Sequence, residues 1–372
     1  MLTPASEEEV AALVREKPAL HAVGSGTKVH HGQTPDPGED LSMAKLDRIV
    51  SHEPGDLVVT VQAGVRLADL QEELLDHNQW LPIDPPYAQA TVGGILATNS
   101  SGPRRLAYGT MRDLLIGIRV VGPDGTVTRS GGKVVKNVTG YDLHKLHIGA
   151  FGTLGIITEA TFKVRPRPQV SAVVLFPCTS MVEAHSLLLS VLASSLRPVA
   201  LEALYRGPAG LARGKSWALV GVEGTRPVLE RHLKELRTLY AAQPQVLEGE
   251  TAGSLWDALR DLPATARESV RVRIAAKPHD LVHILPAEPT WARVGTGLAW
   301  LELAPAADLP DRIAQWHARA AERGGYAVVE SAPLPMPGRE KLPWGLGGNA
   351  LMRSIREMRD PARKLNPGRM VV

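Results

Sequence analysis

The chain has 372 residues, which is long for a single hydrophobic core, so two domains are expected. With 44% hydrophobic and 22% charged residues, its composition is that of an ordinary globular protein. Its net charge is +3, but the basic residues are spread along the chain and only 4% of the residues are aromatic, which argues against a nucleic-acid-binding protein. No apolar run approaches the roughly 20 residues of a membrane-spanning helix, and the acidic N-terminal sequence is unlike a signal peptide, so a cytoplasmic location is expected.

The first half of the chain alternates predicted helices and strands. Ser6 and Glu9 have the spacing of a capping box, which predicts the start of a helix. Gly122 to Gly125 predicts a hairpin turn between two strands. The other predicted elements are a strand ending at Val23, a strand over 57–61, a helix with Leu67, Leu70 and Leu74 on its apolar face, strands over 116–121 and 126–129, and a strand over 155–164.

A proline-rich run from Arg165 to Pro168 ends the first domain, because it can continue neither a helix nor a strand. The second half begins with strand, helix, strand, strand and helix, which is a ferredoxin-like order. A looser second run follows, without sequence similarity to the first. We therefore predict an α+β fold in which the second domain is an antiparallel sheet with helices on one side. The predicted elements are 172–176, 181–193, 199–204, 217–222, 228–240, 270–275, 298–303, 311–323, 326–330 and a terminal helix over 351–359.

A short glycine-rich turn follows the first predicted strand, from Gly24 to Lys28. It lacks the third glycine of a dinucleotide-binding fingerprint, because residue 29 is valine. It also lacks the glycine that stands directly before the lysine of a Walker A loop. What remains is a Gly/Ser/Thr turn whose backbone N–H groups could form an anion-binding nest.

A longer glycine-rich stretch runs from Pro85 to Glu159. Its glycines alternate with threonines, serines and short β-branched runs. Glycine lets a ligand approach the backbone closely, because it has no Cβ and tolerates positive φ. Together with the turn, this stretch predicts a binding surface for a long anionic ligand.

These segments resemble the vanillyl-alcohol oxidase / p-cresol methylhydroxylase family of FAD-binding proteins. The resemblance is carried by GSGTK, by PPYAQATVGGILATNSSGPRRLAYGTMRDLLIG, by GGKVVKNVTGYDLHKLHIGAFGTLGIITE and by the closing DPARKLNPGRM. Within the family, the chain most resembles the FAD-binding subunits of bacterial glycolate oxidases. The resemblance implies a two-part FAD-binding domain over 1–168, a substrate-side domain over 169–330 and a C-terminal segment, 331–372, that returns to the FAD domain.

The resemblance also implies which residues contact FAD, held without a covalent bond. Gly24, Ser25, Gly26, Thr27 and Lys28 would form the pyrophosphate turn. The isoalloxazine and ribityl region would be lined by Pro86, Thr91, Val92, Gly93, Gly94, Ser101, Gly102, Tyr108 and Gly109. The adenine end would be enclosed by Gly152, Thr153, Gly155, Ile156 and Ile157.

Catalytic residues are not assigned by the sequence. Oxidation of a 2-hydroxy acid needs a cation for the carboxylate and a base such as histidine. The candidate histidines are His30, His31, His144, His147, His279 and His283. His279 and His283 have the i,i+4 spacing of two metal ligands on a helix, but no acidic third ligand accompanies them, and no metal is expected. The chain also lacks the H-x-G-D-G-N-x-H segment of catalytic relatives and has Phe151 where their GSEGTLG segment has an acid.

Charged residues near the glycine stretch have competing interpretations. Arg104, Arg105 or Arg112 could face a flavin or substrate anion, or be a solvated loop charge, and the solvated charge is favoured for Arg105. Arg112 and Asp113 are interpreted as a turn element or internal ion pair. The polar segment from Lys136 to Asp142 could hold a loop under the flavin or start a capped helix.

Partners follow from the single cysteine, Cys178, which cannot ligate an iron–sulfur cluster, since such clusters take four thiolates. The resemblance implies a complex with a second flavin-containing catalytic subunit and an iron–sulfur subunit, acting on a 2-hydroxy acid such as glycolate. The main alternative is a self-sufficient FAD-dependent dehydrogenase of a small 2-hydroxy acid. A binding module without redox function is a further alternative, and the composition argues against it.

Overall fold

The computed structural model describes residues 1–133, 141–205, 216–240, 243–264, 268–285, 290–344 and 350–369. The chain forms two compact units. Unit 1 comprises Met1–Ser101, Gly109–Arg167 and Gly347–Val372, and unit 2 comprises Gly102–Tyr108 and Pro168–Leu346. The break at Arg167 lies beside the predicted domain boundary. The predicted returning segment 331–372 is divided between the units, because 331–346 belongs to unit 2.

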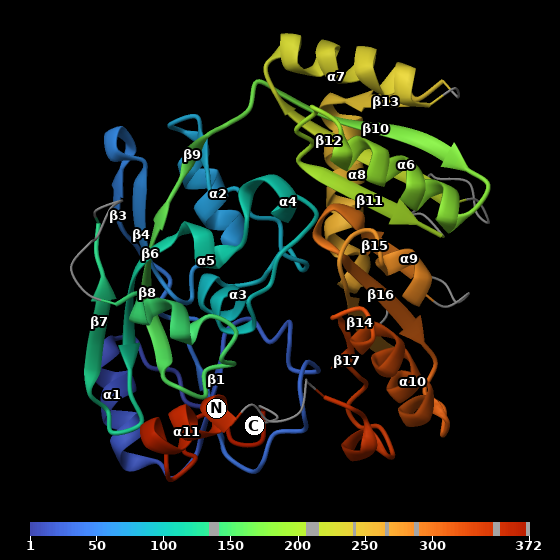
Figure 1. Ribbon diagram of the computed structural model, residues 1–372. Helices are drawn as coiled ribbons and strands as arrows, with labels where there is room; N and C mark the ends of the chain where they lie inside the picture. Colours follow the sequence, from blue (N-terminus) through green and yellow to red (C-terminus); the bar gives the residue numbers. More distant parts are fainter. Residues whose placement is uncertain are drawn as a thin grey trace. The chain divides into compact units, whose positions relative to one another are not determined.

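Unit 1 is built on a five-stranded antiparallel sheet in the order β3-β4-β8-β6-β7 (Figure 1). β8 lies between β4 and β6 and is buried at six of its eight positions, so both faces of the sheet are covered. The parallel pair β1-β2 and the short pair β5-β9 complete the strands described in this unit. The strands are β1 Leu20–Val23, β2 Glu39–Ser42, β3 Ile49–Glu53, β4 Val58–Gln62, β5 Gln79–Trp80, β6 Leu115–Val121, β7 Val127–Gly131, β8 Ile156–Lys163 and β9 Arg165–Pro166.

The helices of unit 1 begin where the sequence supplies caps. Ser6 accepts a hydrogen bond from the N–H of Glu9 at 3.2 Å, as the predicted capping box requires. The Glu9 carboxylate accepts the N–H of Ala5 at 2.8 Å, where a standard capping box would use the N–H of Ser6. The predicted hairpin is also present, since Gly125 has φ +76° in the turn between β6 and β7. The helices are α1 Glu7–Glu16, α2 Leu67–Leu75, α3 Val92–Thr98, α5 Met111–Leu114 and α11 Ala350–Arg359, with 3-10 turns η1 Pro54–Asp56 and η2 Leu143–His147.

Unit 2 contains an eight-stranded antiparallel sheet in the order β13-β10-β12-β11-β15-β16-β14-β17. Its strands are β10 Val170–Cys178, β11 Ala200–Leu204, β12 Ser216–Gly224, β13 Gln245–Glu248, β14 Val270–Ala275, β15 Thr290–Arg293, β16 Leu298–Leu303 and β17 Tyr326–Ser331. Its helices are α4 Arg105–Tyr108, α6 Met181–Ala193, α7 Arg226–Leu239, α8 Gly249–Asp261, α9 Leu281–Ile284 and α10 Leu309–Ala321, with 3-10 turns η3 Leu262–Ala264, η4 Val294–Thr296 and η5 Arg339–Lys341.

The sheet consists of two ferredoxin-like halves. The first half runs β10-α6-β11-β12-α7-β13 and the second β14-α9-β15-β16-α10-β17, and in each half the strands have the spatial order fourth, first, third, second. The halves meet edge to edge through β11 and β15, where Glu202 is the register partner of Arg293. The topology is therefore duplicated although the sequence shows no repeat.

Helix α8, which joins the halves, lies on the face of the sheet opposite α7. Val173 and Gly221 are register partners and share a face, and a Cβ placed on Gly221 would lie 2.4 Å from the ring of Trp256 in α8. Phe176 points to the other face, where its ring meets that of Tyr240 at the end of α7 at 5.4 Å. The predicted arrangement with all helices on one side is therefore wrong for α8, whose sequence was not predicted as a helix.

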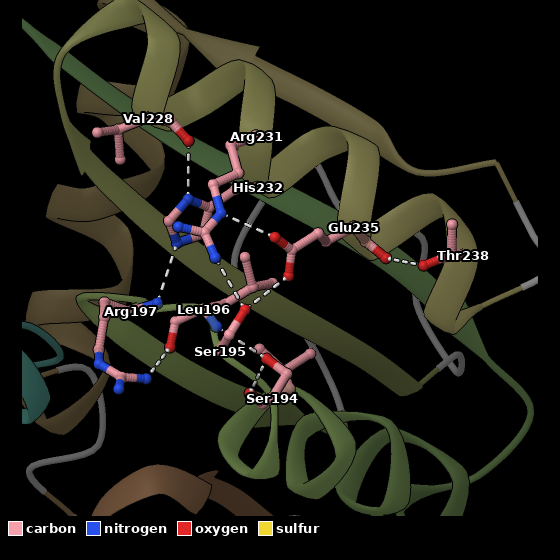
Figure 2. Close-up of polar contacts among 10 residues, drawn as sticks. Ser194, Ser195, Leu196, Arg197, Val228, Arg231, His232, Glu235 and Thr238 are labelled. Carbon is pink, nitrogen blue, oxygen red and sulfur yellow. Dashed lines mark hydrogen bonds and ion pairs between the residues drawn. The ribbon is translucent and has the colours of Figure 1, made fainter.

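A polar network joins α7 to the loop between α6 and β11 (Figure 2). His232 is buried, and its Nδ1 lies 2.8 Å from the carbonyl oxygen of Val228. Its Nε2 accepts a hydrogen bond from the N–H of Arg197 at 3.3 Å. A carbonyl can only accept, so Nδ1 carries the proton and the ring is neutral in this geometry. Arg231 and Glu235 form an exposed ion pair beside it at 2.8 Å. His232 is thus a structural link within unit 2.

Candidate functional site

The turn from Gly24 to Lys28 follows β1, and its two glycines serve different purposes. A Cβ on Gly24 would lie 2.1 Å from Oγ1 of Thr91, so Gly24 is required by close packing against the start of α3. Gly26 has φ +70° and nothing within 4 Å of the position of a Cβ. This open space above a left-handed glycine lets a ligand approach the backbone.

Helix α3 brings the second predicted segment to the turn. Thr91 is its N-cap and accepts the N–H of Gly94 at 3.3 Å. A Cβ on Gly93 would lie 2.8 Å from the Cβ of Ala63, so this glycine allows α3 to pack closely against the rest of unit 1. The structure therefore places Gly24 beside Thr91, as a shared ligand surface requires.

Polar side chains surround the turn. Nζ of Lys28 donates to Oγ of Ser100 at 2.5 Å and lies 5.4 Å from the ring centroid of Tyr87. The Tyr87 hydroxyl lies 3.1 Å from Nε2 of His30. Lys28 supplies a cation next to the open backbone of Gly26, which suits an anionic ligand.

The third predicted segment, around Gly152, packs against the C-terminal tail and the end of α3. The N–H of Phe151 donates to the carbonyl of Ala97 at 2.8 Å. A Cβ on Gly152 would lie 2.3 Å from Nδ2 of Asn366, and one on Gly155 would lie 2.3 Å from Cγ1 of Val120. Packing within the protein thus already explains these two glycines.

The other residues predicted for the adenine end are enclosed by protein. Thr153 is fully buried and donates to the carbonyl of Ala150 at 2.7 Å. Ile156 and Ile157 are buried at the start of β8. These three residues are at most 6% exposed, and their predicted contact with the adenine end of FAD stays a prediction.

Residues 102 to 108, which the sequence places in the flavin region, belong to unit 2 by their contacts. The side chain of Glu223 is 1% exposed, and its carboxylate accepts three hydrogen bonds. The donors are Nε of Arg104 at 2.8 Å, the Tyr108 hydroxyl at 2.8 Å and Oγ of Ser171 at 2.9 Å. The Arg104 guanidinium lies 4.2 Å from the ring of Trp256. The interpretation of Arg104 as a solvated loop charge is therefore wrong, because its guanidinium binds Glu223 and lies against Trp256. The hydroxyl of Tyr108 binds the same carboxylate.

Gly109 and the Arg112-Asp113 pair form a turn in unit 1. Gly109 has φ +79°, and a Cβ there would lie 2.5 Å from a carboxylate oxygen of Asp113. The Asp113 carboxylate accepts the N–H of Thr110 at 2.8 Å in a capping box that starts α5. This agrees with the interpretation of Asp113 as a turn element.

The candidate histidines are divided between the units: His30, His31, His144 and His147 lie in unit 1, and His279 and His283 lie in unit 2. His279 is exposed, and its Nε2 lies 3.2 Å from a carboxylate oxygen of Asp280. It precedes α9, so it does not share a helix with His283. Burial lowers the pKa of His144, and burial with the charge of Arg359 lowers the pKa of His147 to about 4. Over the described ranges, no three His, Cys, Asp or Glu side chains could hold a metal ion. The predicted loop residues Lys136 to Gly140 lie outside these ranges.

Two residues of the C-terminal tail complete the surroundings of the turn. The sequence indicated them only as part of the closing segment that the resemblance returns to the FAD domain, and it did not place them at the turn. Arg369 donates from Nη1 to the carbonyls of Val29 and His31, and Asn366 contacts both Ala22 and Phe151. The only signal in the sequence was the Asn-Pro-Gly-Arg run, which reads equally well as the stop of a terminal helix.

Comparison with known proteins identifies the family of the chain and its cofactor. A family profile described as "FAD binding domain" matches residues 1–131. The chain is 31% identical over 374 residues to the glycolate oxidase subunit GlcE of Escherichia coli (strain K12), covering 98% of this chain and 95% of the relative. The chain belongs to the p-cresol methylhydroxylase type of FAD-binding oxidoreductases. Its cofactor is FAD.

Other relatives of this flavoprotein match part of the chain or share its fold. The glycolate oxidase subunit GlcD of Bacillus subtilis (strain 168) is 35% identical over 206 residues, covering 55% of this chain and 42% of that protein. An alkyldihydroxyacetonephosphate synthase structure covers 99% of this chain and 76% of its own, with a TM-score of 0.66 and 19% identity, which shows a common fold. In the described part of the flavoprotein, no helix has the length and apolarity needed to cross a bilayer.

Proposed function

We propose that this flavoprotein is the FAD-binding subunit of a glycolate oxidase complex. The observation that carries the proposal is the match to GlcE over nearly the whole length of both chains. The Gly24–Lys28 turn supports it, because Gly26 has open space above it and Lys28 lies beside it. The proposal includes the cytoplasmic location expected from the sequence.

The residues that would hold FAD are those of the three predicted segments. The N–H groups of the Gly24–Lys28 turn would bind the pyrophosphate, with Lys28 as the nearby cation. The start of α3 at Thr91 and Gly94 would lie under the flavin. When bound, FAD supplies the oxidant that accepts two electrons from the C2–H of a 2-hydroxy acid.

Partner subunits follow from what the chain lacks. Cys178 is buried and is the only cysteine, so an iron–sulfur cluster that takes electrons onward would reside in another subunit. The missing histidine-rich segment suggests that a second flavin subunit holds the catalytic base. GlcD, itself named as a glycolate oxidase subunit, is a relative of this chain. We therefore propose a complex with a GlcD-like subunit and an iron–sulfur subunit.

A second candidate is a self-sufficient dehydrogenase of a small 2-hydroxy acid. One face of the eight-stranded sheet carries Arg271, Arg273 and Arg293 close to two stacked tryptophans, Trp291 and Trp300. Nη1 of Arg271 and Nε of Arg273 are buried and have no hydrogen-bond partner. Arg271 and Arg273 already pair with Glu302 and Glu330, and the two remaining donors could bind a substrate carboxylate. Relatives named D-lactate dehydrogenase, such as that of Archaeoglobus fulgidus (35% identical over 207 residues), also favour this candidate.

The experiment that separates the candidates is anaerobic addition of glycolate, and separately of D-lactate, to the purified FAD-loaded chain. Flavin absorption that persists with the chain alone, but bleaches when a GlcD-like subunit is added, supports the complex. Bleaching by the chain alone supports the self-sufficient enzyme. Arg271→Met should abolish bleaching in the second case only, while Arg231→Met, on the exposed surface of α7, serves as the control.

A further inference from the structure

The C-terminal tail holds the chain directly after the Gly24–Lys28 turn. Nη1 of Arg369 donates to the carbonyl of Val29 at 2.6 Å and to that of His31 at 2.7 Å. More than 300 residues separate these groups in the sequence. A Cβ on Gly32 would lie 2.9 Å from the Arg369 carbonyl, so the tail backbone also packs closely here. A single side chain therefore sets the direction of two carbonyls that follow the turn.

The same tail holds the chain directly before the turn. The buried Asn366 accepts the N–H of Ala22 at Oδ1 at 2.9 Å and donates from Nδ2 to the Phe151 carbonyl at 2.5 Å. Its backbone N–H donates to the carbonyl of Leu20 at 2.8 Å. Both flanks of the turn are therefore connected to a four-residue tail motif, Asn366 to Arg369. Phe151 links this motif to the Gly152 segment.

Arg369 also places a positive charge at the turn. Burial lowers the pKa of its guanidinium, and the charge of Asp40 opposes that effect. The group stays charged, because the ordinary pKa of arginine is far above neutrality. Among the described residues Arg369 makes no ion pair, and its side-chain partners are neutral carbonyls. Its charge is therefore not neutralised by a carboxylate, and it favours an anion nearby.

We propose that Arg369 is a positioning residue for FAD, which directs the carbonyls of Val29 and His31 away from the pyrophosphate and leaves the N–H groups of the turn to bind it. This inference rests on the proposed assignment of the Gly24–Lys28 turn to the pyrophosphate. A carbonyl facing the pyrophosphate would repel it, so the orientation of these two groups matters for affinity. The guanidinium adds its positive charge to that of Lys28.

The test uses the full-length apoprotein and measures the affinity for FAD, ADP and adenosine. ADP contains the pyrophosphate and adenosine does not. Arg369→Met should weaken binding of FAD and ADP by about tenfold or more, since two hydrogen bonds from a charged group are lost, and should leave adenosine binding unchanged. Arg369→Lys should recover most of the affinity, because an ammonium can donate to both carbonyls. Arg353→Met, an exposed position on α11, is the matched control.

The outcomes separate the inference from the function that it extends. ADP binding by Arg369→Met within twofold of the wild type overturns the inference alone. An equal loss of ADP and adenosine binding also overturns it, because that pattern indicates general damage to unit 1. If the methionine variant does not fold, the affinities for ADP and adenosine are compared in Arg369→Gln instead. A wild-type chain that binds no FAD overturns the proposed function and this inference together.

Discussion

Arg104 donates from Nε to the carboxylate of Glu223 at 2.8 Å, although the two residues lie 119 positions apart. The pair attaches residues 102–108 to unit 2, and both side chains are shielded from solvent, at 13% and 1% exposure. The segment that the sequence assigns to the flavin surface therefore also forms part of the other unit. Glu223 is the centre of this attachment, because Tyr108 and Ser171 donate to the same carboxylate.

Glu223→Gln should destabilise unit 2 by about 3 kcal/mol, because it leaves the buried charge of Arg104 without its counter-charge. Chemical denaturation followed by tryptophan fluorescence would measure this, since Trp256 lies against Arg104. Glu250→Gln, at an exposed position of α8, is the control and should change the stability little. Equal stability of the two variants would contradict the role given to Glu223.

Gly26→Val should abolish FAD binding while the protein still folds. The position has φ +70°, so the side chain adds backbone strain of about 1–2 kcal/mol, and it enters the open space above the turn. Gly324→Val is a matched control, because Gly324 has φ +68° and equally open space but lies in unit 2, after α10. Both variants should lose similar stability, and only the first should lose the flavin. If both variants retained FAD, this would contradict the assignment of the Gly24–Lys28 turn to FAD binding.

His147 should make the protein less stable in mild acid. Its pKa is lowered to about 4 in the folded state by burial and by Arg359, whereas the unfolded chain has the ordinary value of about 6.5. Between these two pH values the unfolded chain binds a proton that the folded chain does not. The free energy of unfolding is therefore at its full value above about pH 6.5 and falls by up to about 1.4 kcal/mol per pH unit towards pH 4.

His147→Gln removes this titration and should flatten the pH dependence of the free energy of unfolding between those pH values. The exposed His279→Gln, in unit 2, is the control for substitution of a histidine as such. Urea unfolding at several pH values measures the slopes. A His147→Gln slope equal to that of the wild type would show that the histidine is protonated equally in both states.

His232→Phe should cost about 1–3 kcal/mol, because the ring keeps its volume but the buried side chain loses its hydrogen bonds with the Val228 carbonyl and with the N–H of Arg197. Arg231→Met, which removes the exposed ion pair next to it in Figure 2, should cost less than about 1 kcal/mol. Thermal unfolding of the two variants gives the comparison. The reverse order would mean that the network is stabilised mainly by its surface charges.

Much of the fold follows from patterns in the sequence. The helix predicted over 181–193 is α6 with the same bounds, and the strands predicted over 270–275 and 298–303 are β14 and β16. These elements have clear caps or apolar runs, which are local signals. Helix α8 has no such start, since Glu248 makes no capping bond and Gly249 opens the helix. Its stability comes from burial of Trp256 and Leu259 against the sheet, which a local pattern does not reveal.

The candidate FAD site could also be predicted from the sequence only where the signal is local. The glycines at 24 and 26 were predictable because positive φ and close packing both demand glycine. The roles of Glu223 and Arg369 were not, because each acts through contacts with residues far away in the sequence, 119 positions for Arg104 with Glu223 and 340 for Val29 with Arg369. A single sequence shows the residue type at such positions but not its partner. The assignment of individual residues to FAD stays a prediction.

The most direct test of the central claim is the visible absorption spectrum of the purified wild-type chain after incubation with FAD and removal of unbound cofactor. Flavin bands at a stoichiometry of about one FAD per chain, lost in Gly26→Val and kept in Gly324→Val, are the predicted result. A wild-type chain without flavin bands would contradict the account that the Gly24–Lys28 turn and its surroundings form an FAD site.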